Sequence, residues 1–194
     1  ISSAMSGAFH MAQEAARLVK IPVHVVDSKG PSMTLGWQVL EAARARDKGE
    51  AVDGILEDAD RVRQKMVQIV GMNTLSFLQQ GGRIGDAAKW IGSKLQIKPV
   101  ISINHETGKV EPAGIAATYS GLMDMVFKKF VEKVGTGEKL HVAVMHGNAL
   151  DEAKQLAGRI SEHFRDIELI VNITGPVLGL NTGPRALAIC GYFE

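Results

Sequence analysis

The chain has 194 residues, enough for one large or two small domains, and its 45% hydrophobic and 22% charged residues are typical of a globular protein. Its net charge of +1 does not indicate binding to nucleic acid or to an anionic membrane, so we expect no nucleic-acid partner. The single cysteine, Cys190, excludes an internal disulfide and fits a reducing, cytoplasmic location. No apolar run reaches the roughly 18 residues of a membrane span, so we expect no stable membrane insertion.

The first residues form a loop rich in hydroxyl groups, which leads into a predicted helix over residues 8–19. The chain starts at Ile1, within what reads as a strand end, so we expect an upstream segment to be missing. Ser6 stands at the N-cap position, where its hydroxyl and the free amides of the helix suit a carboxylate or phosphate. The alternative is that Ser6 caps its own helix and does nothing else.

Strands and helices alternate through the next part of the chain. We predict a strand over residues 22–28, helices over residues 32–46 and 52–66, and a strand over residues 67–70. The inward face of the first of these helices is expected to carry Leu35, Val39, Leu40 and Ala43. The alternation predicts an α/β architecture with a mainly parallel sheet in a first domain, residues 1–70.

A glycine pair interrupts the chain at the start of the second predicted domain, residues 71–194. Gly81 and Gly82 end a short helix because glycine has the largest backbone entropy to lose. They leave Arg83 beside a flexible turn, where its planar guanidinium can hold an anion. The alternative is a helix end with a solvated arginine. Asp86 is the expected N-cap of a following helix that reaches Gly92.

The remaining segments predict a mixed α/β sheet. A strand over residues 100–103 returns as a hairpin, and a helix covers residues 119–134. Residues 140–145, 148–164 and 167–171 form a βαβ unit, so its two strands should be parallel. The glycine-rich residues 174–187 carry no nucleotide-binding fingerprint and read as turns between short strands.

No pattern of catalytic or metal-binding residues stands out. The six histidines lack metal-ligand spacing, and neither HExxH nor CxxC occurs. His146 closes a strand, but a structural histidine at a sheet edge is the simpler interpretation. We expect no metal, no cofactor and no catalytic residue.

Several short segments, in this order, are similar to the DegV family. They are Ser-Ser-Ala-Met-Ser-Gly at residues 2–7, Val-Asp-Ser at 26–28, Leu-Gln-Gln-Gly-Gly-Arg-Ile at 78–84, Ile-Lys-Pro-Val at 97–100, Gly-Pro at 175–176 and Thr-Gly-Pro at 182–184. Each segment is weak alone, but together they extend over nearly the whole chain. The family usually begins with a further segment that includes a first strand, which agrees with the expectation raised by Ile1.

The resemblance implies a bacterial protein of two α/β domains that binds a long-chain fatty acid between them and is not itself an enzyme. In part of the family, the fatty acid is presented to a separate kinase for phospholipid synthesis. The carboxylate would be held by hydroxyl groups, with Arg83 balancing its charge. The implied ligand-binding residues are Ser3, Ser6, Gly7, Arg83, Asn181 and Thr182. Apolar residues of the second half would form the tunnel walls, for example Phe77, Leu78, Ile91, Leu95 and Ile101; the alternative is that these residues belong to the ordinary hydrophobic core.

Three positions depart from the family pattern. Asn181 stands where the family often has a histidine, and Arg185 stands where a glycine often follows Gly-Pro. An arginine common after the hairpin is missing near residues 116–118. These departures favour a carrier over a kinase substrate. Two alternatives remain: a small-ketone-binding subunit of dihydroxyacetone kinase type, and an inert fragment whose sheet edge is left open.

Overall fold

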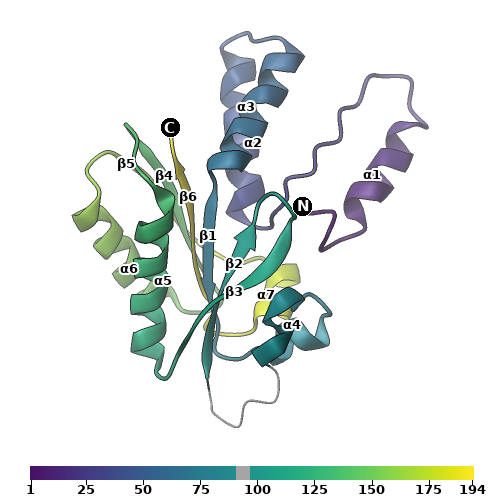
Figure 1. Ribbon diagram of the computed structural model, residues 1–194. Coiled ribbons are helices and arrows are strands. Elements are labelled where there is room, and N and C mark those ends of the chain that lie inside the picture. The colour runs from purple at the N-terminus through teal and green to yellow at the C-terminus, as the bar shows by residue number, and fades with distance from the viewer. Residues whose placement is uncertain (91–96) are drawn as a thin grey trace. The chain divides into compact units, whose positions relative to one another are not determined.

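The computed structural model describes residues 1–90 and 97–194, which form two compact units. Unit 1 comprises Ile1–Gln64 and Asn104–Lys109, and unit 2 comprises Lys65–Ile103 and Val110–Glu194. Figure 1 shows the helices and strands of both.

Unit 1 contains helices α1 (Ala8–Ala16), α2 (Met33–Asp47) and α3 (Val52–Lys65). The strand predicted over residues 22–28 is wrong, because this segment is irregular and has no strand partner among the described residues. A strand needs a neighbour to satisfy its backbone groups, and here Val23 and Val26 are 46% and 44% exposed. The mainly parallel sheet predicted for the first domain is therefore absent from the described residues.

The buried face of α2 also differs from the prediction. Its buried residues are Thr34, Trp37, Gln38 and Ala45, whereas Leu35 and Val39 are exposed. Trp37 is fully buried, and its large ring outweighs the smaller aliphatic side chains in selecting the face that leaves water. The amide of Gln38 is satisfied there, because it donates to the carbonyls of Ser28 and Thr34 at 3.0 and 2.8 Å.

Unit 2 is built on one six-stranded mixed sheet in the order β3-β2-β1-β6-β4-β5. Strand β4 pairs in parallel with β5, as predicted for the βαβ unit, whereas β1 pairs antiparallel with β2 and β6, and β4 pairs antiparallel with β6. The α/β class is confirmed, and the sheet is mixed. The strands are β1 (Val67–Gly71), β2 (Lys98–Asn104), β3 (Lys109–Ala116), β4 (Leu140–His146), β5 (Ile167–Ile173) and β6 (Leu187–Phe193).

Helices of unit 2 follow the strands. They are α4 (Ser76–Gln80), a 3₁₀ helix η1 (Gly85–Trp90), α5 (Tyr119–Val134), α6 (Leu150–His163) and α7 (Pro176–Thr182). Asp86 is not an N-cap, because it lies inside η1; the end of that predicted helix lies outside the described residues. The turns predicted after residue 174 are instead helix α7 and the start of β6.

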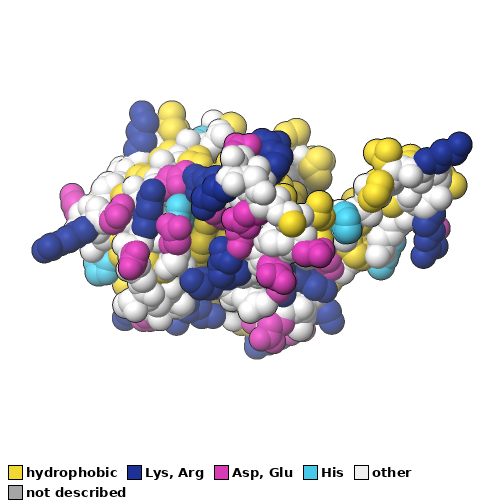
Figure 2. Space-filling model, turned by 90° about the horizontal axis from the view of Figure 1, so that it is seen from above, with side chains coloured by type: hydrophobic (Ala, Val, Ile, Leu, Met, Phe, Trp, Pro, Cys, Tyr) yellow, Lys and Arg dark blue, Asp and Glu magenta, His cyan; other side chains and the backbone are white. Residues whose placement is uncertain are grey.

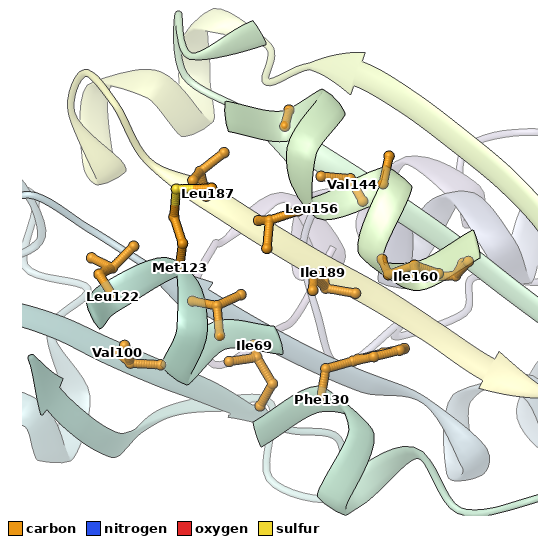
Figure 3. Packing of buried hydrophobic residues seen from close by; sticks show 14 of the residues in the cluster. Ile69, Val100, Leu122, Met123, Phe130, Val144, Leu156, Ile160, Leu187 and Ile189 are labelled. Atoms are coloured by element: carbon orange, nitrogen blue, oxygen red, sulfur yellow. The ribbon is translucent and has the colours of Figure 1, made fainter. Parts of the chain in front are cut away.

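The core of unit 2 lies between the sheet and helices α5 and α6, which cover one face (Figure 3). Phe130 and Leu122 of α5, Leu156 and Ile160 of α6, and Ile189 of β6 are fully buried in this cluster. Burial of each such side chain stabilises the fold by about 1.5–3 kcal/mol. This packing fixes the strand ends that carry the candidate site.

Candidate ligand-binding site

The carboxyl ends of strands β1, β4 and β5 and the start of β6 lie along one edge of the sheet in unit 2. Gly71 at the end of β1 and His146 at the end of β4 both align with Leu187 at the start of β6. His146 also aligns with Ile173 at the end of β5. Carboxyl ends of strands in α/β folds are the usual place for a ligand. The segments that follow β1 and β5 therefore meet at this edge.

Helices α4 and α7, which follow β1 and β5, are in contact. A Cβ atom at Gly81 would overlap the side-chain carboxamide of Asn181, and one at Gly183 would overlap the ring of Phe77. Gly183 also has φ +74°, a conformation that favours glycine. The two glycine-rich segments singled out in the sequence, around Gly81 and around Gly183, are thus neighbours within unit 2.

Three predicted site residues lie in these neighbouring segments. The guanidinium of Arg83 is exposed and donates to the carbonyl of Gly81. Asn181 Nδ2 donates to the Val177 carbonyl at 2.9 Å, and Thr182 Oγ1 donates to the Leu178 carbonyl at 3.0 Å. Asn181 and Thr182 close helix α7, and both are partly buried. The primary amide of Asn181 carries a second N–H group that can face a ligand.

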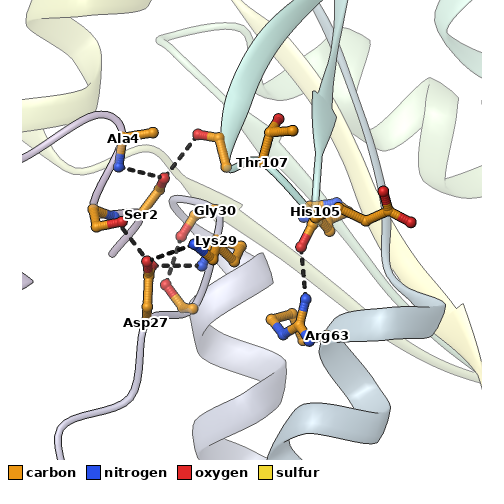
Figure 4. Close-up of polar contacts among 12 residues, drawn as sticks. Ser2, Ala4, Asp27, Lys29, Gly30, Arg63, His105 and Thr107 are labelled. Atoms are coloured by element: carbon orange, nitrogen blue, oxygen red, sulfur yellow. Dashed lines mark hydrogen bonds and ion pairs between the residues drawn. The ribbon is translucent and has the colours of Figure 1, made fainter.

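Ser3 belongs to a polar network in unit 1 that is centred on Asp27 (Figure 4). The amides of Ser3 and Lys29 donate to Asp27 Oδ1 at 3.0 and 3.1 Å, and Lys29 Nζ lies 3.0 Å from Oδ2. Burial alone would raise the pKa of Asp27, but the hydrogen bonds from Ser3 and Lys29 lower it to about 2. The Ser3 hydroxyl contributes to that shift, so Ser3 already serves a carboxylate of the chain itself.

A residue not chosen from the sequence, Ser2, is the fully buried hydroxyl of this loop. Its Oγ donates to the Gly108 carbonyl at 2.7 Å and accepts from the Ala4 amide at 3.2 Å. Ser2 therefore anchors the first loop to the turn between β2 and β3. This contact could not be predicted from local patterns, because the two residues lie 106 positions apart.

Ser6 and Gly7 stand at the start of α1. The Ser6 hydroxyl accepts from the Ala8 amide at 3.2 Å, and the Gly7 carbonyl accepts from the Met11 amide at 3.0 Å. Gly7 is the N-cap residue, one position later than expected, and it is exposed. The Ser6 oxygen accepts in this contact, and a hydroxyl that accepts still has its own proton to donate. Ser3, Ser6 and Gly7 thus share one loop of unit 1.

His105 lies in the hairpin turn of unit 1 and is 9% exposed. Among the described residues, neither of its ring nitrogens has a hydrogen-bond partner. Arg63 donates to the backbone carbonyl of His105 at 2.7 Å (Figure 4). Burial, with the nearby charge of Arg63 as a further cause, lowers the pKa of His105 to about 4. The imidazole is therefore neutral near pH 7.

His146 is buried at the end of β4, where its Nδ1 accepts a hydrogen bond from the Ala149 amide at 3.2 Å.

Of the expected tunnel residues, Leu78 and Ile101 are 4% and 2% exposed and Phe77 is partly buried; Ile91 and Leu95 lie outside the described residues. An open hollow of about 450 Å³ on α3 is lined by none of the candidate residues.

Charged side chains of both signs are interspersed over the face in Figure 2, which agrees with the net charge of +1. Within residues 1–90 and 97–194, no three His, Cys, Asp or Glu side chains are placed to hold a metal ion. In the same part of the chain, no helix has both the length and the apolar character needed to cross a bilayer.

A sequence model of the DegV family, described as uncharacterised proteins, matches residues 1–194. A DegV domain-containing protein of Clostridium acetobutylicum is 33% identical over 202 residues, which cover 100% of this chain and 69% of that protein. One of Streptomyces coelicolor is 33% identical over 190 residues, 97% of this chain and 66% of that protein. The chain thus spans about two thirds of the length of these relatives.

Solved structures of DegV family proteins are similar to the whole chain, among them the following two. A DegV family protein from Thermus thermophilus, described by its fatty acid binding, has a TM-score of 0.93 at 28% identity and is matched over 69% of its length. DegV from Bacillus subtilis, described as a fatty acid binding protein, has a TM-score of 0.88 at 27% identity and is matched over 68%. Both matches cover 100% of this chain.

Proposed function

The chain belongs to the DegV family, and from that premise we propose that it binds a long-chain fatty acid as a binding protein and not as an enzyme. The observation that carries the proposal is that relatives described as fatty acid binders share its fold over its full length. The meeting of the two glycine-rich segments at the carboxyl edge of the sheet supports it, since this edge is where ligands bind in α/β folds.

The ligand chemistry follows from two free-energy terms. Each buried methylene contributes about 0.8 kcal/mol, so a long acyl chain supplies ample gross affinity before ordering costs. A carboxylate taken out of water is costly unless it is hydrogen-bonded. The protein therefore has to offer an apolar wall and a small set of polar donors, and we propose hydroxyl and amide groups for the second part.

The hydrogen bonds rank the proposed head-group residues. Ser6 and Asn181 have a proton to donate while keeping their present contacts, whereas Ser3 is engaged with Asp27 and Thr182 with the Leu178 carbonyl. To bind the ligand, the Thr182 hydroxyl would have to give up its hydrogen bond to the Leu178 carbonyl and donate to the carboxylate instead. Gly7 is the N-cap residue of α1, and the positive end of the helix dipole there favours a carboxylate. The positive charge of Arg83 offsets the negative charge of the carboxylate.

Native mass spectrometry of the purified protein, followed by denaturing extraction, tests the proposal. A mass excess released as a fatty acid is expected. The double variant Ser6→Ala, Thr182→Ala should retain less of it, because two donors are lost. The matched control is Ser161→Ala, Thr136→Ala, which removes two exposed hydroxyls outside the candidate segments. Equal retention in both double variants would refute the assigned head-group residues.

We also propose a carrier role over presentation to a separate kinase. Asn181 cannot titrate, and the arginine expected near residues 116–118 is replaced by Ala-Ala-Thr. The small-ketone alternative needs a nucleophilic imidazole, and His146 at this edge is buried with Nδ1 accepting a backbone amide. Incubating loaded protein with a fatty acid kinase and ATP would decide the matter, since acyl phosphate formation would contradict a pure carrier.

A further inference from the structure

Arg185 is tied to three elements of unit 2. Its amide donates to the Gly147 carbonyl at 2.6 Å, just after β4, and its carbonyl accepts from the Tyr119 hydroxyl at 2.9 Å, at the start of α5. Its guanidinium lies 4.0 Å from the centre of the Tyr119 ring and 2.8 Å from the Glu152 carboxylate, in the first turn of α6. We call Arg185, Tyr119 and Glu152 the arginine tether.

The backbone of Arg185 is in a conformation that a side chain seldom adopts. Its φ is +60°, in the left-handed region, which is unfavourable for residues other than glycine unless the surroundings fix it. Stacking on an aromatic ring and a charge-assisted hydrogen bond are contacts that hold an arginine in place. The tether therefore explains why an arginine is stable at this position.

Arg185 lies three residues after Thr182, in the loop that joins α7 to β6. The other end of this loop is fixed at Gly183, whose α carbon lies against the ring of Phe77. The loop is thus held by α4 on one side and by the starts of α5 and α6 on the other. Asn181 and Thr182 stand directly before the held segment.

We propose that Arg185 is a positioning residue, which through Tyr119 and Glu152 fixes the loop after α7 and so sets how long Asn181 and Thr182 retain the ligand carboxylate. This inference rests on the proposed fatty acid binding. A donor that is already in place loses less conformational entropy when the ligand arrives, so it holds the ligand longer. Loosening the tether should act mainly on the dissociation rate.

Two variants loosen the tether in different ways. Arg185→Gly removes the guanidinium and suits the positive φ, so the fold should persist. Tyr119→Phe keeps the ring under the guanidinium and removes one hydrogen bond to the Arg185 carbonyl. Dissociation of cis-parinaric acid, a fluorescent long-chain fatty acid, is followed after mixing loaded protein with excess oleate. We expect dissociation to become about three- to tenfold faster in Arg185→Gly, with a smaller increase in Tyr119→Phe.

The matched control is Arg159→Ala. Arg159 makes the same pair of contacts elsewhere, with its guanidinium 4.3 Å from the Phe127 ring centre and 2.9 Å from the Asp124 carboxylate. Its loss should leave the dissociation rate unchanged. Arg185→Lys keeps the charge beside Glu152 and should recover part of the retention. Wild-type dissociation rates in both Arg185→Gly and Tyr119→Phe would overturn the proposal, and Tyr119→Phe alone decides it if Arg185→Gly does not fold.

Hydrogen exchange of ligand-free protein separates this inference from the proposed function. The amides of residues 181–183 and of residue 185 should exchange faster in Arg185→Gly than in wild type, whether or not the protein binds a ligand. Faster exchange with no parinaric acid binding by the wild type would refute the proposed function and leave the tether supported as a loop anchor, so the ligand role would fall. Unchanged exchange would overturn the tether itself.

Discussion

The ring of Phe77 occupies the space beside the α carbon of Gly183, so that α4 and the end of α7 touch where no side chain fits. Gly183 has φ +74° as well. Gly183→Ala should therefore destabilise the protein by about 2 kcal/mol or more, through both steric overlap and backbone strain. Urea unfolding of the variant and the wild type measures this difference.

The control for this prediction is Gly179→Ala within α7. A Cβ there meets nothing within 4 Å, and the residue lies in a helix. Alanine is preferred over glycine in helices by about 1 kcal/mol, so this variant should be neutral or more stable than the wild type. If the two variants had the same stability, the close contact between Phe77 and Gly183 would be wrong.

Asp27 should make stability depend on pH in the acid range. Its pKa falls from 3.8 to about 2 on folding, so the folded state binds its proton less readily than the unfolded state. The resulting stabilisation, about 2 kcal/mol, is complete above the unfolded pKa and is lost as pH falls through about 2. Asp27→Asn should remove it. The difference in unfolding free energy between wild type and variant should shrink between pH 4 and pH 2.

A variant at an exposed acidic residue serves as the reference. Asp47 pairs on the surface with Arg46, and both side chains are about 70% exposed. Asp47→Asn should change stability by well under 1 kcal/mol at any pH. A constant gap between wild type and Asp27→Asn down to pH 2 would mean that Ser3 and Lys29 do not hold the carboxylate as described.

The second half of the chain was predictable because its patterns are local. Apolar spacing predicts residues 119–134 as a helix, and α5 has those limits. The strand–helix–strand order of residues 140–171 predicts a parallel pair, and β4 and β5 are parallel. A buried helix face and a right-handed crossover need little information beyond the segment itself.

The wrong predictions lie in segments whose structure depends on residues far away in the sequence. Residues 22–28 have the apolar character of a strand, but a strand forms only beside another strand, and none lies there among the described residues. The segment of helix α7 is predicted as turns because it contains Gly175, Gly179 and Gly183, but its packing on α4 stabilises a helix there. Within the candidate site, the loops could be chosen from sequence, but the existing bonds from Ser3 to Asp27 and from Thr182 to Leu178 could not.

His105 should produce a separate pH effect at milder acidity. Its pKa falls from 6.5 to about 4 on folding, because burial disfavours the charged imidazole and the nearby charge of Arg63 adds to this effect. The contribution of neutral His105 to the free energy of unfolding is therefore fully present above about pH 6.5, and about 3 kcal/mol of it is lost as pH falls to 4. His105→Gln cannot titrate, so its stability should decline less between these pH values. The free energy of unfolding is measured by chemical unfolding at each pH. If it fell equally with pH in wild type and variant, the burial of this histidine would be contradicted.

Fatty acid should raise thermal stability by mass action. Free ligand at 100 times its dissociation constant stabilises the folded state by about 2.7 kcal/mol. For a chain of this size that is roughly 5–10 °C in Tm. Calorimetry of delipidated protein with added oleate measures the shift. Oleyl alcohol, which has the same chain but no carboxylate, should give a smaller shift, because the donors at Ser6, Asn181 and Thr182 then lose an anionic acceptor. Equal shifts from acid and alcohol would show that the acyl chain alone is recognised.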